Sequence, residues 1–192
     1  MIQLKKAHIS IIIGLSIMTA CTQQQTFIPK PPTYLELQFP ERTYSIYQDN
    51  CGYSFSKPSY FTIKEANNSP CNRDIDFGML NGVLFLSRMD MDTSLSAYIN
   101  YALGKIDEHK IKATAIYDST FIRKEDKVYG TFFELQGNVA SPFQFYLTDS
   151  TSRFVSGVVY FNTRPNYDSI KPVLNFVKKD LYEFMNTLKW DN

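Results

Sequence analysis

Few residues of this chain have a type and spacing that could carry out catalysis. The chain has two histidines, and only His109 lies beyond the N-terminal apolar segment. It ends a charged, predicted helix, where the helix dipole stabilises a solvated imidazolium, and we interpret it that way rather than as a general base. Ser141 lacks a nucleophile elbow, and the sequence contains no P-loop and no paired-histidine zinc motif. The sequence therefore predicts a protein that is not an enzyme.

Two carboxylates with a spacing suited to a cation are Asp74 and Asp76, which fall on one face of a predicted strand. The sequence places no third carboxylate or histidine beside them, so we favour a solvated strand face over a cation site. We predict no metal and no other cofactor.

The N-terminal segment carries the signature of a covalent modification. A basic head precedes an apolar run at residues 9–17, which is too short to span a bilayer comfortably, and small residues ending in Ala20 precede Cys21. This arrangement resembles the bacterial lipobox. We predict that residues 1–20 are a signal peptide and that Cys21 is lipidated, with palmitate among its acyl chains. The alternative is an ordinary cleaved signal followed by an incidental cysteine.

A lipid on Cys21 implies a membrane-tethered protein, because several acyl chains together hold firmly. Residues 22–26 are polar and uncharged, with no aspartate after the cysteine, which favours the outer membrane and a domain facing the periplasm. Prolines within residues 27–32 predict an extended spacer. We therefore expect a lipid anchor and Pro-rich spacer at residues 21–33 and a single α+β domain at residues 34–192.

The charge balance excludes one class of partner. Loss of the signal peptide removes two lysines and no acids, leaving 18 basic residues against 19 acidic ones. A net charge of about −1 argues against nucleic acid as a partner. Without catalytic groups, we also expect no small-molecule substrate, which leaves the membrane and other proteins.

Two cysteines, Cys51 and Cys71, remain once Cys21 is acylated. In an oxidising periplasm an even pair predicts a disulfide. Closing a loop of roughly twenty residues would stabilise the fold by about 3 kcal/mol in the chain-entropy model. Metal binding by this pair is disfavoured, because two thiolates without a nearby histidine make a poor zinc site.

Three serines, Ser119, Ser150 and Ser169, each follow an aspartate and precede a threonine or an apolar residue. The pattern resembles the O-glycosylation sequon of Bacteroidota periplasmic proteins. Asp-Ser pairs also suit turns and helix caps, which is the interpretation we favour, and both can hold where the hydroxyl is exposed. An intact mass without added hexose, measured on protein from the native host, would exclude the glycan.

Hydrophobic periodicity predicts mostly strands. We expect a hairpin at Asn81-Gly82, a turn or bulge near Asp118-Ser119, and an irregular segment at residues 49–58. The predicted strands are residues 34–39, 43–47, 60–64, 72–80, 83–89, 111–122, 127–136, 143–148 and 153–162.

Two amphipathic helices complete the pattern. Asp92 is expected to cap a helix that ends near Lys110, and Asp168 a helix whose apolar side runs from Ile170 to Leu188. The fold class is therefore α+β: an antiparallel sheet, made of a meander and N-terminal hairpins, covered by two helices. The element order is similar to that of PsbP/Mog1-like domains, a similarity that says nothing about function.

Sequence stretches spread along the chain also match a known family. They are residues 51–55, 58, 70–71, 74–77, 111–113, 127–130, 137–145, 148–151, 157–162, 165–166 and 168–169. Their order and spacing, covering residues 29–190, resemble the gliding motility lipoprotein GldD family of Bacteroidota. The resemblance implies a non-enzymatic lipoprotein needed for gliding and type IX secretion, acting through other proteins in the assembly of an envelope machine. It offers no catalytic residues.

If the protein is such an assembly factor, its contact surface is expected on loops held by the sheet. We place it at the region between the two cysteines, with Tyr53 and Phe55, and at the loop of Asn138 and Pro142. The alternative function is a periplasmic ligand-binding or chaperone-like lipoprotein unrelated to motility.

Overall fold

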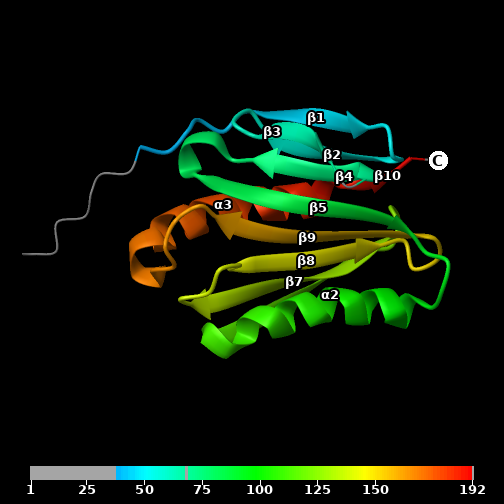
Figure 1. Ribbon diagram of the computed structural model, residues 1–192. Helices are drawn as coiled ribbons and strands as arrows, with labels where there is room; N and C mark the ends of the chain where they lie inside the picture. The colour runs from blue at the N-terminus through cyan, green and yellow to red at the C-terminus, as the bar shows by residue number, and fades with distance from the viewer. Residues whose placement is uncertain (1–37, 68, 192) are drawn as a thin grey trace, which may run out of the picture. The chain divides into compact units, whose positions relative to one another are not determined.

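The strands of the computed structural model, which describes residues 38–67 and 69–191, form two antiparallel sheets (Figure 1). The larger has seven strands in the order β3 (Thr62–Ala66), β4 (Ser69–Asp76), β5 (Gly82–Asp90), β9 (Arg153–Phe161), β8 (Phe143–Thr148), β7 (Val128–Gly137) and β6 (Ala113–Arg123). The smaller has three strands in the order β1 (Tyr44–Asp49), β2 (Tyr53–Pro58) and β10 (Lys189–Trp190).

The two helices, α2 (Leu95–His109) and α3 (Tyr167–Thr187), cover opposite faces of the seven-stranded sheet (Figure 1). Neighbouring residues of β8 show this directly, since successive side chains of a strand point to opposite faces. The amide of Gln144 donates to the carbonyl of Lys105 in α2, whereas the ring of Phe145 packs 5.5 Å from that of Phe184 in α3. The α+β fold class, with antiparallel strands and two amphipathic helices, is confirmed.

The main core lies on the α3 face. Phe184 links the two sheets through this helix, because its ring packs 4.3 Å from Phe55 of β2 and 5.5 Å from Phe145 of β8. Gly157 in β9 leaves room for Phe145, since a Cβ there would lie 2.3 Å from the ring. A larger residue at position 157 would therefore displace the aromatic centre of the core.

Strands β6 to β9 form the predicted meander, and β4 and β5 the predicted hairpin. The hairpin connection is longer than expected, because a 3₁₀ turn at Gly78–Leu80 precedes Asn81, which adopts the left-handed conformation with φ of 52°. The predicted turn or bulge near Asp118 is wrong. This residue pairs regularly with Phe133 in the middle of β6, and the register shift lies near the start of that strand.

Residues 53–58, predicted as irregular, form strand β2 instead. Turn-forming residues on either side conceal its alternation, in which Tyr53 and Phe55 are buried. Both predicted helix caps were also wrong. Ser94 precedes α2, and Asp92 instead accepts a hydrogen bond from the hydroxyl of Tyr98. The side chain of Asn166 caps α3.

Several predictions fall outside the described residues. These are the signal peptide, the lipidation of Cys21, the spacer at residues 21–33 and most of the strand predicted at residues 34–39. Gln38 and Phe39, the described part of that strand, are not in a strand.

Candidate interaction surface

The region of Cys51 and Cys71 joins the two sheets. The cysteines form a disulfide with Cα atoms 5.6 Å apart, which connects the turn between β1 and β2 to strand β4. Beside it, the guanidinium of Arg73 contacts both carboxylate oxygens of Asp49, at 2.7 and 2.9 Å. We call these four residues, Asp49, Cys51, Cys71 and Arg73, the inter-sheet clamp.

Asp49 and Arg73 are buried, and their polar atoms have several partners. Asp49 also accepts from the backbone amide of Cys51 at 2.8 Å and from the hydroxyl of Tyr47 at 3.1 Å. Arg73 also donates to the carbonyl of Pro70 at 2.6 Å. Because a buried charge is tolerated only when it is paired and hydrogen-bonded, this geometry indicates a structural role.

The contact residues predicted from the sequence are mostly inaccessible. Tyr53 and Phe55 are 0% and 1% exposed, and Pro142 is also buried. The burial of these three side chains argues against a direct contact with a partner, since a side chain in the core is not accessible to another protein. Asn138 is exposed, but its side-chain oxygen accepts from the backbone amide of Tyr167 and so links this loop to the start of α3.

A second buried acid, Asp180, lies on the inner side of α3. Its carboxylate accepts from Arg42 at 2.9 Å and from the hydroxyls of Tyr44 and Tyr60 at 2.5 Å each. Burial, followed by the hydrogen bonds to Asp180, raises the pKa of both tyrosines above the ordinary value, so they remain donors. The guanidinium of Arg42 also stacks 3.7 Å from the centre of the Phe176 ring. The cluster attaches the first described strand to the last helix.

The residues considered for catalysis occupy separate positions. The imidazole of His109 is half-buried and lies 3.3 Å from the hydroxyl of Tyr160, so it is not the freely solvated residue that was predicted. The buried hydroxyl of Ser141 donates to the carbonyl of Phe143. Within residues 38–67 and 69–191, no group of three or more His, Cys, Asp or Glu side chains could hold a metal ion.

The three serines of the proposed sequons are all exposed. Ser119 lies in β6, Ser150 in the turn between β8 and β9, and Ser169 in the first turn of α3. Turn chemistry accounts for the second site, because Asp149 accepts from the backbone amides of residues 151–153. Glycosylation of these serines stays a prediction.

Strand β6 is the feature of the described surface best suited to a partner. It spans 11 residues at one edge of the seven-stranded sheet and pairs only with β7 among the described strands. Its side chains include three large exposed apolar groups, Ile116, Tyr117 and Ile122, which are 42%, 55% and 62% exposed. Proteins usually shield such an edge, because its free backbone groups and apolar side chains attract another strand.

The opposite edge of the sheet is protected in the usual ways. Strand β3 has only five residues, its register shifts at Glu65, and Lys64 adds a second charge. Strand β6 has two charged residues, and the guanidinium of one of them, Arg123, donates to Asp126 and to the carbonyl of Leu188. Sequence reasoning located this strand but not its edge position, which depends on the order of strands in space.

Taken together, the fold is an α+β domain whose buried polar groups serve structure and whose open strand edge is suited to protein contacts. The family model for gliding motility lipoprotein GldD matches residues 24–190, and the chain belongs to that family. This membership confirms the resemblance noted in the sequence. It is a lipoprotein family associated with motility rather than an enzyme family, and it indicates anchoring to the cell envelope.

A solved structure with a similar layout is the solution structure of cyanobacterial PsbP (CyanoP) from Synechocystis. The two chains share 13% sequence identity with a TM-score of 0.43, over 73% of this chain and 92% of the other. No curated protein matches the chain. Among the described helices, none combines the length and the hydropathy needed to cross a membrane.

Proposed function

We propose that the protein is a non-enzymatic lipoprotein, anchored through Cys21, that supports gliding motility and type IX secretion by binding other proteins of that machinery. Its domain faces the periplasm, with the outer membrane as the favoured location. The family supports the link with motility and the lipid anchor. The sequence supports the anchor's position, because Cys21 follows a basic head, a short apolar run and small residues.

The observation that carries the binding role is the open edge of β6. An extended segment of a partner can add to such an edge through backbone hydrogen bonds, and side chains then select the partner. The exposed side chains Ile116 and Ile122 lie six residues apart on this strand, on one face of the sheet. An extended segment of a partner that pairs with β6 would contact Ile116 near the start of the strand and Ile122 near its end.

Deletion of the gene in its host, followed by complementation, tests this function. The expected result is loss of both colony spreading and secretion of type IX cargo, with both restored by the wild-type chain. Normal secretion together with accumulation of a small metabolite or of misfolded envelope proteins would instead support the ligand-binding or chaperone-like alternative. A robust turnover activity of the purified protein would contradict a non-enzymatic role.

A further inference from the structure

The edge strand β6 carries a pattern of side chains that is the same in both directions along the chain. Two short polar residues flank Ser119, two aromatic residues lie next to these, and two isoleucines lie outermost. The pairs are Asp118 with Thr120, Tyr117 with Phe121, and Ile116 with Ile122. A two-fold symmetric interface requires a surface that is complementary to itself, because both subunits contribute the same residues. Two β6 strands that pair antiparallel about Ser119 would meet this requirement.

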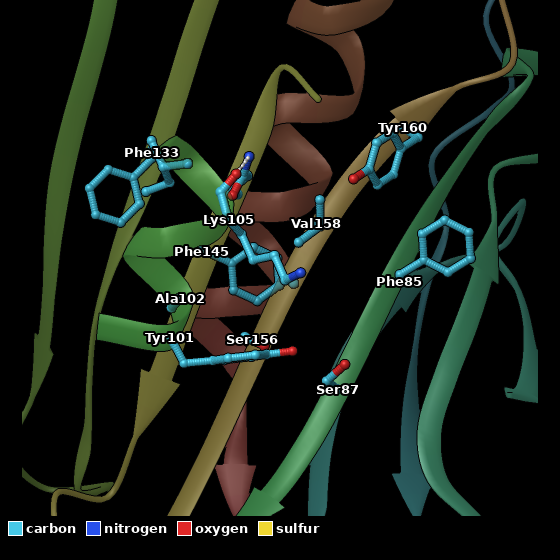
Figure 2. Close-up of a pocket in the computed structure, with 13 residues that line it drawn as sticks. Phe85, Ser87, Tyr101, Ala102, Lys105, Phe133, Phe145, Ser156, Val158 and Tyr160 are labelled. Atoms are coloured by element: carbon cyan, nitrogen blue, oxygen red, sulfur yellow. Dashed lines mark hydrogen bonds between the residues drawn. The ribbon is translucent and has the colours of Figure 1, made fainter. Parts of the chain in front are cut away.

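The two residues of each pair lie on the same face of the sheet. Phe133 of β7, which lies beside α2 in Figure 2, lines the pocket between that helix and the sheet and pairs with Asp118. Because opposite residues share a face and side chains alternate along a strand, Asp118, Thr120 and both isoleucines lie on the α2 side. The ring of Phe121 stacks 5.6 Å from that of Tyr182 in α3, so the aromatic pair lies on the other side.

The register centred on Ser119 also brings unlike groups together. The carboxylate of Asp118 then lies opposite Thr120 of the second copy, whose hydroxyl can donate to it. Centring the pairing on Asp118 would place two carboxylates opposite each other, which is destabilising. Centring it on Tyr117 or on Thr120 would place the carboxylate opposite an isoleucine. Of these registers, only the one centred on Ser119 matches apolar with apolar and polar with polar side chains.

The centre of the strand is accessible to a second strand. Residues 116–120 are all exposed, and β6 pairs only with β7 among the described strands. A second copy would cover part of the exposed apolar surface of Ile116, Tyr117 and Ile122, and burial of such surface favours association.

We propose that the chain, in the absence of another partner, forms a two-fold symmetric dimer in which β6 pairs antiparallel with β6 of a second copy about Ser119. The two larger sheets then continue into one another, so neither copy leaves this edge open. A strand from another protein of the machinery would use the same edge, so the dimer and that complex exclude each other. The proposal depends on the β6 edge and not on the role in motility.

Disulfide trapping of the purified full-length chain tests the centre of the interface. Directly opposite residues of an antiparallel pair have Cβ atoms about 4.5–5.5 Å apart, close to the separation that a disulfide requires. Under a mild oxidant, most of the Ser119→Cys chain should therefore migrate at twice the monomer mass on a non-reducing gel, and reduction should reverse this.

Two controls accompany this measurement. Ile46→Cys reports random collision at an exposed position, and the unsubstituted chain reports any contribution of Cys21, so both should remain monomeric. Cys51 and Cys71 are already paired with each other. Equal dimer yields at positions 119 and 46, or no dimer from a folded Ser119→Cys chain, would overturn the proposal.

Cysteines at the outer pair test the register. Ile116→Cys alone and Ile122→Cys alone should give little dimer, because each position lies six residues, or about 20 Å, from its own copy. The variant with both substitutions should give dimer in high yield, since the two positions lie opposite each other across the two-fold axis. High yields from either single variant would show a different register and overturn the proposal.

Thr120 provides a matched pair of charge variants. Thr120→Asp places a second carboxylate opposite Asp118, whereas Thr120→Lys places an ammonium group there, and both alter an exposed residue. Because this contact occurs twice in a two-fold dimer, the dissociation constant of the dimer should be about tenfold higher for Thr120→Asp. Analytical ultracentrifugation measures both values, and equal constants would overturn the proposal.

The outcome for the dimer is separate from that for the proposed function. If the purified chain stays monomeric while the deletion strain loses spreading and secretion, the dimer proposal fails and the proposed function stands. If the dimer forms as expected while the deletion strain spreads and secretes normally, the proposed function fails and the dimer stands.

Discussion

At the scale of single residues, buried charges account for how the parts of this domain are joined. Asp180 stands within the apolar side of α3, four residues before Phe184 and three after Val177. A charge inside an apolar helical face is the signal that could have revealed it, because this position has to be buried. The sequence does not show its partners, since Arg42 and Tyr60 lie far away along the chain.

Removing the Asp180 carboxylate should destabilise the domain strongly. Asp180→Ala leaves Arg42, Tyr44 and Tyr60 without their shared acceptor, and breaking a buried pair costs about 3–5 kcal/mol. Chemical denaturation measures the change in free energy of unfolding. Lys179→Ala, at the next and exposed position of α3, is the control and should change stability by less than about 0.5 kcal/mol. Similar values for both variants would contradict the structural role of Asp180.

Asp149 should make the stability depend on pH in the acid range. Although burial opposes it, hydrogen bonds from the backbone amides of Arg153, Ser152 and Thr151 lower the pKa of this carboxyl to about 2. A carboxyl with a lowered folded-state pKa contributes stability that is present above its unfolded pKa of about 3.9 and is lost as the pH falls through 2.

Comparison with Asp149→Asn isolates this contribution. The thermal midpoint of the variant should lie below that of the wild type at pH 7, and the two should converge between pH 4 and pH 2. A difference in midpoint that stays constant over this range would show that the carboxylate charge does not stabilise the turn.

At the scale of elements, the sequence predicted the meander well, although only β7 alternates over most of its length between buried and more accessible residues, and β8 is largely buried on both faces. Strand β8 was predicted with its observed bounds, Phe143–Thr148. Strand β2 was missed, since Gly52 and Pro58 at its ends favour turns. The same error explains why Tyr53 and Phe55 were predicted to contact a partner. With β2 interpreted as a loop, these two buried residues were expected at the surface.

The disulfide of the inter-sheet clamp should stabilise the fold without being needed for it. Replacing Cys51 and Cys71 with serine removes a cross-link over 20 residues, which corresponds to about 3 kcal/mol of unfolding free energy. The domain should still fold, because Asp49 and Arg73 continue to join the same elements. Denaturation curves of the double variant give the loss, and near-UV circular dichroism reports the packing. Loss of the near-UV signal in the absence of denaturant would contradict this division of roles.

Charges on β6 should block its edge without unfolding the domain. Ile116→Lys combined with Ile122→Lys replaces two exposed apolar side chains, so the thermal midpoint should change little, whereas colony spreading and cargo secretion should fall sharply. Ile46→Lys on the smaller sheet is the matched control, since Ile46 is 81% exposed, and it should leave both functions intact. Normal spreading of the double variant would exclude the β6 edge as a necessary contact.

At the scale of the whole molecule, a disulfide and buried ion pairs join the parts of the described domain. The inter-sheet clamp and the Asp180 cluster attach the smaller sheet to β4 and to α3. A domain whose parts are joined in this way, with the long open edge of β6, is suited to holding a partner in a fixed position. The family sequence pattern identified this protein class, whereas the contact surfaces depend on strand order and could be found only in three dimensions.

The lipid anchor should be necessary in addition to the domain. Cys21→Ser removes the thiol that we propose is acylated, so the chain should leave the membrane fraction and fail to restore spreading to the deletion strain. Fractionation with immunoblotting, together with the spreading assay, checks both points. Membrane retention of the Cys21→Ser chain would contradict lipid anchoring at this residue.

The most direct measurement of the central claim is site-specific photo-crosslinking in living host cells. A photoreactive residue at Ile122 of the full-length chain should give a crosslink to a protein of the motility or type IX secretion machinery, identified by mass spectrometry. The same residue at Ile46 should not, and Ile116→Lys should remove the Ile122 crosslink. Crosslinks of equal yield at both positions, or none at Ile122 in cells that glide and secrete, would contradict a binding role for the β6 edge.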